Sequence, residues 1–173
     1  GVIFTNNQLL KKKFDLLRNF GHDGPEKFNG IGINGKNSDL HAAIGLANFQ
    51  SVKTILDKRK LQFEYYDNLL FSKRVSIKKQ KLNKDMTKYN YSYYPLIFPK
   101  VKMALKVQKV LAENNIISKR YFYPLINNLK YTKNKGRTPV AIEMDGKVLC
   151  LPLHHYLNRS NQEKIIKLIL KVI

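Results

Sequence analysis

Residues 30–50 read GIGINGKNSDLHAAIGLANFQ, and this stretch joins a glycine-rich loop to the start of a helix. Gly30, Gly32 and Gly35 allow the backbone to turn sharply or to lie close to another group. Residues 37–38, Asn and Ser, offer a side-chain oxygen to cap a helix at the point where apolar residues begin to recur at helical spacing. The stretch therefore predicts a loop followed by a helix.

Asn34 and Lys36 lie in this loop, just before the helix N-terminus. The free N–H groups and the dipole of a helix N-terminus favour anions. Glycine-rich loops before helices are common, however, and Asn34 can equally be a turn residue and Lys36 a solvated cation. From the residues alone, an anion site and a plain turn both remain open.

The first 70 residues otherwise alternate between short apolar and amphipathic segments. Residues 2–4 predict a short buried strand, and Thr5 with Gln8 has the spacing of a capping box for a following helix. Apolar residues recur at helical spacing over residues 52–70, which predicts a helix of about five turns. Such a helix can link two domains.

Beyond residue 71 the apolar pattern becomes that of a small α/β domain. Alternation and apolar runs predict strands over residues 75–78, 89–94, 116–122 and 148–151. Helical spacing predicts helices over residues 103–111 and after a capping box formed by Ser160 and Glu163. Residues 127–145 read as a loop with at most a short helix near 140–143. The fold class is therefore mixed α/β.

The composition is that of a folded chain. Its 173 residues are 43% hydrophobic, with 9 Phe and 10 Tyr, enough to bury a core. No run approaches the eighteen apolar residues of a membrane span. The one cysteine, Cys150, predicts a small core residue in a reducing, cytoplasmic setting, without a disulfide framework or a zinc cluster.

The net charge of +20 indicates, by itself, a nucleic-acid or other anionic partner. The basic residues are mostly Lys spread along the chain, and their one dense block, residues 78–84, reads as an exposed turn. Arg, the usual reader of base edges, is scarce. We therefore expect a solvated surface with no nucleic acid and no membrane as partner, and keep a basic nucleic-acid-binding α/β domain as the alternative.

Residues 32–46 resemble the signature of the DegT/DnrJ/StrS family of pyridoxal-phosphate-dependent nucleotide-sugar aminotransferases. That signature reads Gly-x-Asn-x-(Arg/Lys)-Met-(Ser/Thr)-(Asp/Glu)-x-x-Ala-Ala, and this chain departs from it with Asn37 in place of Met. Other family segments are matched, in order, by residues 1–7, 17–22, 121–125 and 148–154. The resemblance thus spans the whole chain.

The resemblance implies that the chain is the C-terminal part of a type I pyridoxal-phosphate transferase. Residues 1–50 would then end the large cofactor-binding domain, with the Asn34 loop and an Ala-rich helix. Residues 51–70 would be the linking helix, and residues 71–173 the small α/β domain with short, mostly antiparallel strands. The family's cofactor lysine would lie upstream of Gly1, so we expect no catalytic residue here and no activity from this chain alone.

The resemblance also implies transfer of an amino group from an amino acid, usually glutamate, to a nucleotide-linked keto-sugar, with pyridoxal 5'-phosphate as electron sink. In the family, the position of Asn34 reaches the cofactor phosphate of the partner subunit in a homodimer. Lys36 occupies the basic position that suits a nucleotide diphosphate, and Arg120, Tyr121 and Tyr123 flank a substrate-binding motif. These five residues are the candidate site residues.

Several alternatives accompany this assignment. Some family members carry His in place of the cofactor lysine and are sugar dehydratases, and the deciding residue lies outside this chain.

Ile126 stands where the family often has His after the Pro-Leu pair. His154 and His155 are adjacent, and neighbours on a strand point to opposite faces, so no metal site is expected.

Overall fold

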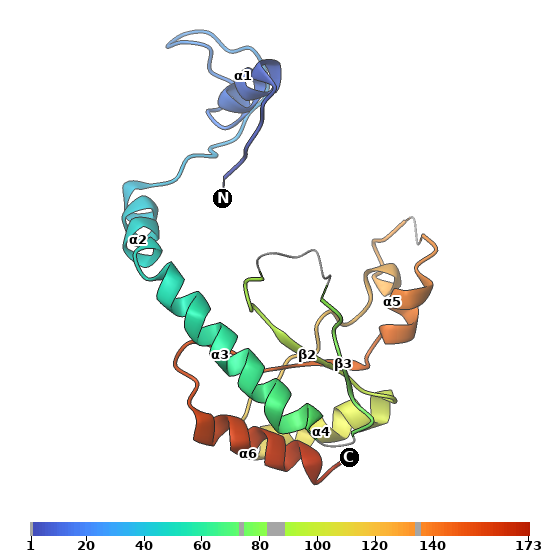
Figure 1. Cartoon of the computed structure of the whole chain (residues 1–173). Helices are drawn as coiled ribbons and strands as arrows, with labels where there is room; N and C mark the ends of the chain where they lie inside the picture. The colour runs from blue at the N-terminus through green and yellow to red at the C-terminus, as the bar shows by residue number, and fades with distance from the viewer. Residues whose placement is uncertain (1, 73–74, 83–88, 134–135) are drawn as a thin grey trace. The chain divides into compact units, whose positions relative to one another are not determined.

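The computed structural model describes residues 2–72, 75–82, 89–133 and 136–173. The chain forms two compact units, Gly1–Ser51 and Val52–Ile173 (Figure 1). The assignment of residues 1–50 to a large domain, 51–70 to a linking helix and 71–173 to a small domain stays a prediction. Within the described residues, no helix is both long and apolar enough to cross a bilayer.

The first helix, α1 (Gln8–Leu17), begins where the sequence predicts but with a different cap. The Asn7 side chain accepts hydrogen bonds from the backbone N–H groups of Leu9 and Leu10, at 2.9 and 3.1 Å. Thr5 was expected to cap the helix, but its hydroxyl accepts a bond from the Asn7 N–H at 3.1 Å instead. The capping prediction was wrong because Asn7 satisfies two of the free donors itself.

Residues 2–4, predicted to be a buried strand, are neither paired nor buried. Val2 is 75% exposed and Phe4 is 92% exposed. An extended segment becomes a strand only when another strand takes up its backbone hydrogen bonds. In the part of the chain that the structure describes, no segment does so, and the prediction was wrong on that account.

The second helix, α2 (Asp39–Phe49), confirms the predicted loop-to-helix transition. Ser38 is its N-cap, and the hydroxyl oxygen accepts a bond from the His41 N–H at 3.3 Å. No described residue of α2 is buried, and its apolar side chains, such as Leu46 and Phe49, are 72% and 75% exposed. A helix with this many exposed apolar side chains is normally covered by other protein.

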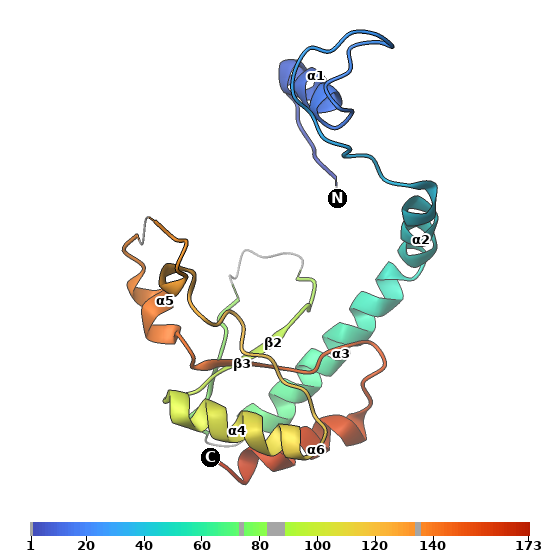
Figure 2. The same cartoon turned by 180° about the vertical axis from the view of Figure 1, so that it is seen from behind.

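The second unit is built on an antiparallel sheet of order β1-β2-β3. Its strands are β1 (Lys78–Lys79), β2 (Tyr94–Ile97) and β3 (Val148–Leu151). Three helices pack on one face of it: α3 (Val52–Phe71), α4 (Val101–Glu113) and α6 (Arg159–Leu170). Figure 2 shows α4 and α6 together below the sheet. Two short helices, η1 (Ile126–Asn128) and α5 (Pro139–Met144), lie outside this layer.

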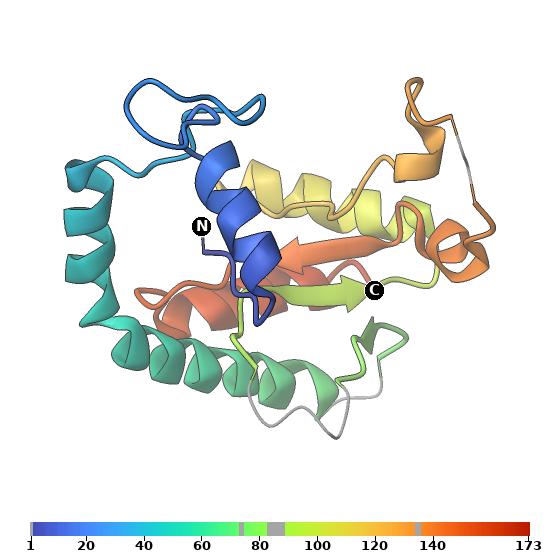
Figure 3. The same ribbon diagram turned by 90° about the horizontal axis from the view of Figure 1, so that it is seen from above.

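The alternation of β2 decides which of its side chains enter the core. Tyr94 and Leu96 are fully buried against the helices, where Tyr66 and Leu70 of α3 meet them. Since neighbouring residues of a strand face opposite ways, Pro95 and Ile97 lie on the other face of the sheet. Figure 3 shows β2 beside β3, and it is the face of these strands away from the helices that carries a candidate site.

The strand predicted over residues 89–94 was wrong, because β2 begins only at the last of them. Tyr91 has a φ of 48°, in the left-handed region, which interrupts an extended run. Pro95 occupies the strand without breaking it. It lies opposite Cys150, whose backbone N–H and C=O bond to Lys119, at 2.7 and 3.0 Å. The sheet therefore needs no hydrogen bond from position 95, where proline has no backbone N–H to donate.

The other predictions for this unit had mixed outcomes. Residues 116–122 are not a strand and contribute only the isolated bridge of Lys119 to Cys150. The strand predicted over 75–78 is reduced to β1, and part of the lysine block at 78–84 lies outside the described residues. The helices α3, α4, α5 and α6 and the strand β3 confirm their predictions. Asn158, rather than Ser160, caps α6.

Candidate functional site

The turn that carries Asn34 and Lys36 has its shape fixed by two glycines. A Cβ on Gly32 would lie 2.4 Å from the Gly21 nitrogen and 2.6 Å from the Leu17 carbonyl oxygen. Both are backbone atoms that cannot move aside. A Cβ on Gly35 would lie 3.0 Å from the Cβ of Arg18. The two chain segments therefore approach as closely as they do only because these positions lack side chains.

Asn34 is presented on this turn with its side chain free. Its backbone forms an isolated antiparallel bridge with Asn19, and its side chain is exposed. Within the described residues, its amide makes no hydrogen bond, and the non-glycine residues with positive φ are Phe20, Tyr91 and Asn115. A left-handed φ is therefore not the reason for an Asn here. The free amide N–H can donate to an anionic oxygen.

Lys36 is held beside a cleft of about 870 Å³ in the first unit. Its ammonium group lies 5.3 Å from the ring centroid of Phe20, a cation–π contact that restrains the side chain. Lys11 and Arg18 also line the cleft, but both bond to the Asp15 carboxylate, at 3.2 and 3.3 Å. Hydrogen bonds from these two cations hold the pKa of Asp15 below its usual value.

Lys36 is therefore the cation of this cleft that has no carboxylate partner among the described residues. An exposed ammonium group is a suitable point charge for a phosphate. Asn34, two residues earlier, does not line this cleft, so the turn offers its amide and the Lys36 ammonium group as two separate donors, neither with a competing bond among the described residues. The arrangement can bind an anion.

In the second unit, Arg120 and Tyr123 form one stacked group. The guanidinium carbon of Arg120 lies 3.7 Å from the ring centroid of Tyr123. Gly146 backs the arginine: with φ +73° it is in the left-handed region, and a Cβ there would lie 2.8 Å from Nη2 of Arg120. The Nε of Arg120 is buried and has no hydrogen-bond partner among the described residues. Stacking and packing thus orient this arginine.

Tyr121 belongs to a different group from Tyr123. Its ring meets that of Tyr93 edge to face, with centroids 5.2 Å apart, while Tyr123 turns to Arg120. The strand predicted over residues 116–122 is not formed, so the side chains of this segment do not alternate between two faces. Tyr93 was not singled out from the sequence, where it was one of several tyrosines in a supposed strand.

Tyr93 and Tyr121 line a cleft of about 450 Å³ on the sheet face opposite the helices. Cys150 of β3 contributes to its floor and is only 6% exposed, in agreement with the predicted core position. Burial raises the pKa of the Cys150 thiol to about 11. The thiol is therefore protonated at neutral pH and is not a nucleophile. In the described residues, no group of three or more His, Cys, Asp or Glu could hold a metal.

A model of the DegT/DnrJ/EryC1/StrS aminotransferase family matches residues 1–170. The chain is 34% identical, over 178 residues, to the dTDP-4-amino-4,6-dideoxy-D-glucose transaminase of Escherichia coli, with 98% of the chain and 47% of that protein covered. A protein of the same name from Shigella dysenteriae is 33% identical, with 99% and 48% covered. The chain thus spans about half the length of these curated relatives.

Solved structures share the fold. TlmJ, an aminotransferase from Streptoalloteichus hindustanus, matches with a TM-score of 0.84 and 19% identity, over 95% of this chain and 45% of that one. Helicobacter pylori PseC, an aminotransferase involved in the biosynthesis of pseudoaminic acid, matches with a TM-score of 0.78 and 23% identity, over 97% and 47%.

Proposed function

The chain belongs to the DegT/DnrJ/EryC1/StrS aminotransferase family, and from this premise we propose that it is the C-terminal portion of an enzyme that transfers an amino group from glutamate to a nucleotide-linked keto-sugar. The observation that carries the proposal is the family match over residues 1–170. That match includes the turn on which Asn34 and Lys36 are displayed. The two curated relatives are named for dTDP-4-amino-4,6-dideoxy-D-glucose, so a dTDP-linked 6-deoxyhexose with a carbonyl at C4 is the first substrate to test.

The residues of the turn fit one part of pyridoxal 5'-phosphate, its phosphate group. When bound, the cofactor supplies the electron sink for moving the amino group. The free amide of Asn34 is a donor and has no internal hydrogen bond among the described residues. Within the proposal, Asn34 donates to the phosphate of a cofactor held by a second subunit, and Lys36 offers its charge to the substrate diphosphate.

A homodimer is part of the proposal, because the first unit carries an uncovered apolar helix. The side chains of α2 are exposed, and a Cβ on Gly45 would meet no atom within 4 Å. Ala42 and Ala43 stand beside it, so a second backbone can approach this surface closely. We propose that the small residues of α2, together with α3, contact the partner subunit.

Arg120, Tyr121 and Tyr123 are the proposed substrate contacts of the second unit. The guanidinium of Arg120 stacks on the ring of Tyr123 and occupies the space that a side chain at position 146 would need. A fixed guanidinium can present two parallel N–H donors to a diphosphate oxygen pair. Tyr121 adds an aromatic surface beside Tyr93. A cytoplasmic location stays a prediction.

The test is amino transfer by the full-length protein. It would be supplied with pyridoxal phosphate, glutamate and the dTDP-linked 4-keto-6-deoxyhexose. The expected products are 2-oxoglutarate, in an enzyme-coupled assay, and a sugar nucleotide whose mass shows an amino group in place of the carbonyl oxygen. Loss of water from the sugar without 2-oxoglutarate would identify a dehydratase and refute the proposal.

A further inference from the structure

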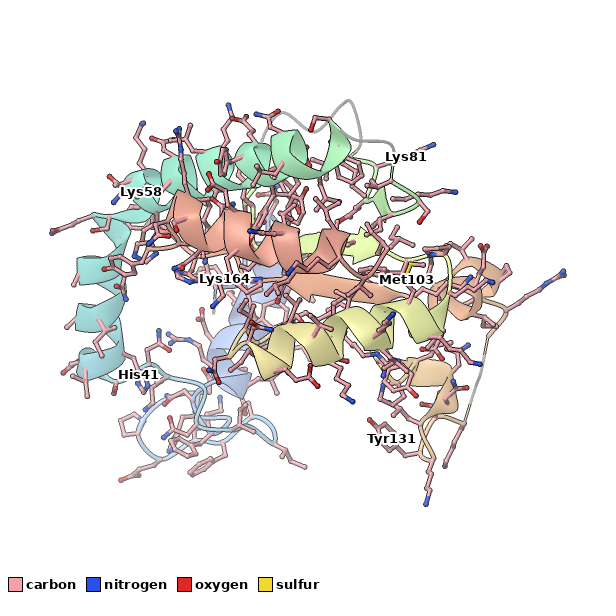
Figure 4. All side chains as sticks on the ribbon, turned by 90° about the horizontal axis from the view of Figure 1, so that it is seen from below. His41, Lys58, Lys81, Met103, Tyr131 and Lys164 are labelled. Carbon is pink, nitrogen blue, oxygen red and sulfur yellow. The ribbon has the colours of Figure 1, made fainter. Side chains whose placement is uncertain are left out.

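The outer surface of the helical layer in the second unit gathers lysines that are far apart in the sequence. Three come from α4 and three from α6 or its C-terminal cap, and all six are exposed. We call this set the lysine face, and its members are Lys102, Lys106, Lys109, Lys164, Lys167 and Lys171. Figure 4 views the layer from this side, with Lys164 labelled.

Each helix contributes one stripe. The lysines of α4 are spaced i, i+4, i+7, and those of α6 are spaced i, i+3, i+7, which places each set along one side of its helix. The opposite side of each helix is buried, at Val107 and Leu111 in α4 and at Ile165 and Ile169 in α6. At 1.5 Å rise per residue, a stripe is about 10 Å long.

The two stripes are neighbours, because α4 and α6 contact each other in the core layer. Packed helices have axes about 8–10 Å apart. Six ammonium groups therefore share one surface whose dimensions are comparable with the screening length of about 8 Å at physiological salt. At these separations the charges act on a partner together.

The lysine face has little internal counter-charge. Of its six members, only Lys109 has a carboxylate within 4.0 Å among the described residues, Glu113 at 3.9 Å. On α3, by contrast, Lys53 is paired with Asp57 at 2.7 Å. Uncompensated like charges on one surface repel one another, and an external anionic surface relieves that repulsion.

We propose that the lysine face binds the anionic phospholipid headgroups of a membrane surface. Its charges are ammonium groups presented by two adjacent helices, and clustered lysines on helices are attracted to anionic lipid. Leu105, 42% exposed between the lysines of α4, can enter the headgroup region. The α4 and α6 sequences contain no aromatic residue on which nucleic-acid bases could stack. A lipid surface therefore fits this face better than a nucleic acid does.

In the sequence these lysines are dispersed, and no membrane partner was expected from it. The two stripes are separated by some fifty intervening residues, and only the packing of α4 against α6 brings them together. The proposed contact attaches the protein to the surface of a membrane and does not require a segment that crosses it. Lipid binding by the lysine face is independent of the proposed aminotransferase activity, since none of the six lysines belongs to the candidate site.

The test is cosedimentation of the full-length protein with vesicles of phosphatidylcholine, with and without phosphatidylglycerol. Binding is expected only with phosphatidylglycerol and should fall steeply with added salt. The face variant combines K106Q, K164Q and K167Q. At about fivefold per lysine, it should bind about a hundredfold more weakly. A control variant combining K12Q, K13Q and K27Q removes the same charge from the first unit and should bind like the parent chain.

Three results would overturn the proposal: no binding to phosphatidylglycerol vesicles, equal weakening of the face and control variants, or tighter binding of a short DNA duplex with the same dependence on the lysine face. Circular dichroism checks that each variant is folded. If the first face variant does not fold, the combination of K102Q, K109Q and K171Q tests the same surface with its other three lysines and must show the same loss.

Discussion

Replacing Asn34 with Ala separates a role in binding from a role in folding. The side chain of Asn34 is exposed and makes no hydrogen bond within the described residues, and its φ is not positive. Ala can adopt this backbone conformation without strain. We therefore expect N34A to leave the free energy of unfolding within about 0.5 kcal/mol of the parent value, as for other exposed sites.

The expected effect on cofactor binding is much larger. If the Asn34 amide donates to a phosphate, N34A removes a hydrogen bond to a charged group, which contributes about 1.5 to 3 kcal/mol. The dissociation constant of pyridoxal phosphate in the full-length enzyme should then rise about tenfold to a hundredfold. N34D keeps the shape but replaces the donor with a carboxylate, so it should weaken binding further than N34A. Titration of the bound cofactor by absorbance gives these constants directly.

A mixed dimer tests whether the donor comes from the partner subunit. One subunit carries N34A, and the other lacks the upstream cofactor lysine but keeps Asn34. The single site that retains its lysine then receives an intact Asn34 from the other chain, and its affinity should be normal. Weak binding at that site in a verified heterodimer would refute the role across the interface. An unchanged dissociation constant for N34A itself would refute the phosphate contact altogether.

The other predictions follow from single features of the structure. G32A places a Cβ 2.4 Å from the Gly21 nitrogen, so this turn should lose about 1 to 3 kcal/mol, seen as faster hydrogen exchange over residues 18–35. Because burial raises the pKa of the Cys150 thiol to about 11, a thiol reagent at pH 8 should modify the native chain far more slowly than the chain unfolded in guanidinium, and equal rates would contradict the burial. The 173-residue chain alone should retain no pyridoxal phosphate through gel filtration, whereas a bound absorbance band abolished by mutating one of its lysines would show a cofactor lysine within it.

The sequence predicted the helices well and the strands poorly, for a physical reason. Helical hydrogen bonds are local, so periodic apolar residues were enough to locate α3, α4 and α6. A strand depends on a partner that the local sequence does not reveal. Residues 2–4 have no partner in the described structure, and residues 116–122 pair at a single position. Alternating apolar residues alone could not show this.

The two capping errors have a common cause. Thr5 and Ser160 each stand three residues before a Gln or Glu, which is the pattern of a capping box. In both cases an Asn two residues away, Asn7 or Asn158, is the actual cap. Asn is as good an N-cap as Ser or Thr. The motif therefore located each helix start to within two residues but could not choose between competing caps.

The part of the candidate site that lies within one short stretch of sequence was predictable, whereas the part formed by residues distant in the sequence was not. The turn around Asn34 was found because its glycines lie within the same short stretch. The stacking of Arg120 on Tyr123 was missed, since the segment was taken for a strand with alternating faces. Gly146, which makes room for that arginine, lies 26 residues later in the chain and is brought to it only by tertiary packing.

The two units differ in how they are stabilised, and this difference bears on the proposed site. The second unit has its own core, from Tyr66 to Ile169, whereas in described residues 2–51 only Gly21 is buried. Burial of apolar surface is the main source of folding stability, so the first unit gains stability chiefly from whatever covers it. In the proposed dimer that cover includes the partner subunit. Because Asn34 belongs to this unit, formation of the proposed dimer also stabilises the position of Asn34. Dissociating the dimer should therefore weaken cofactor binding even when every site residue is intact.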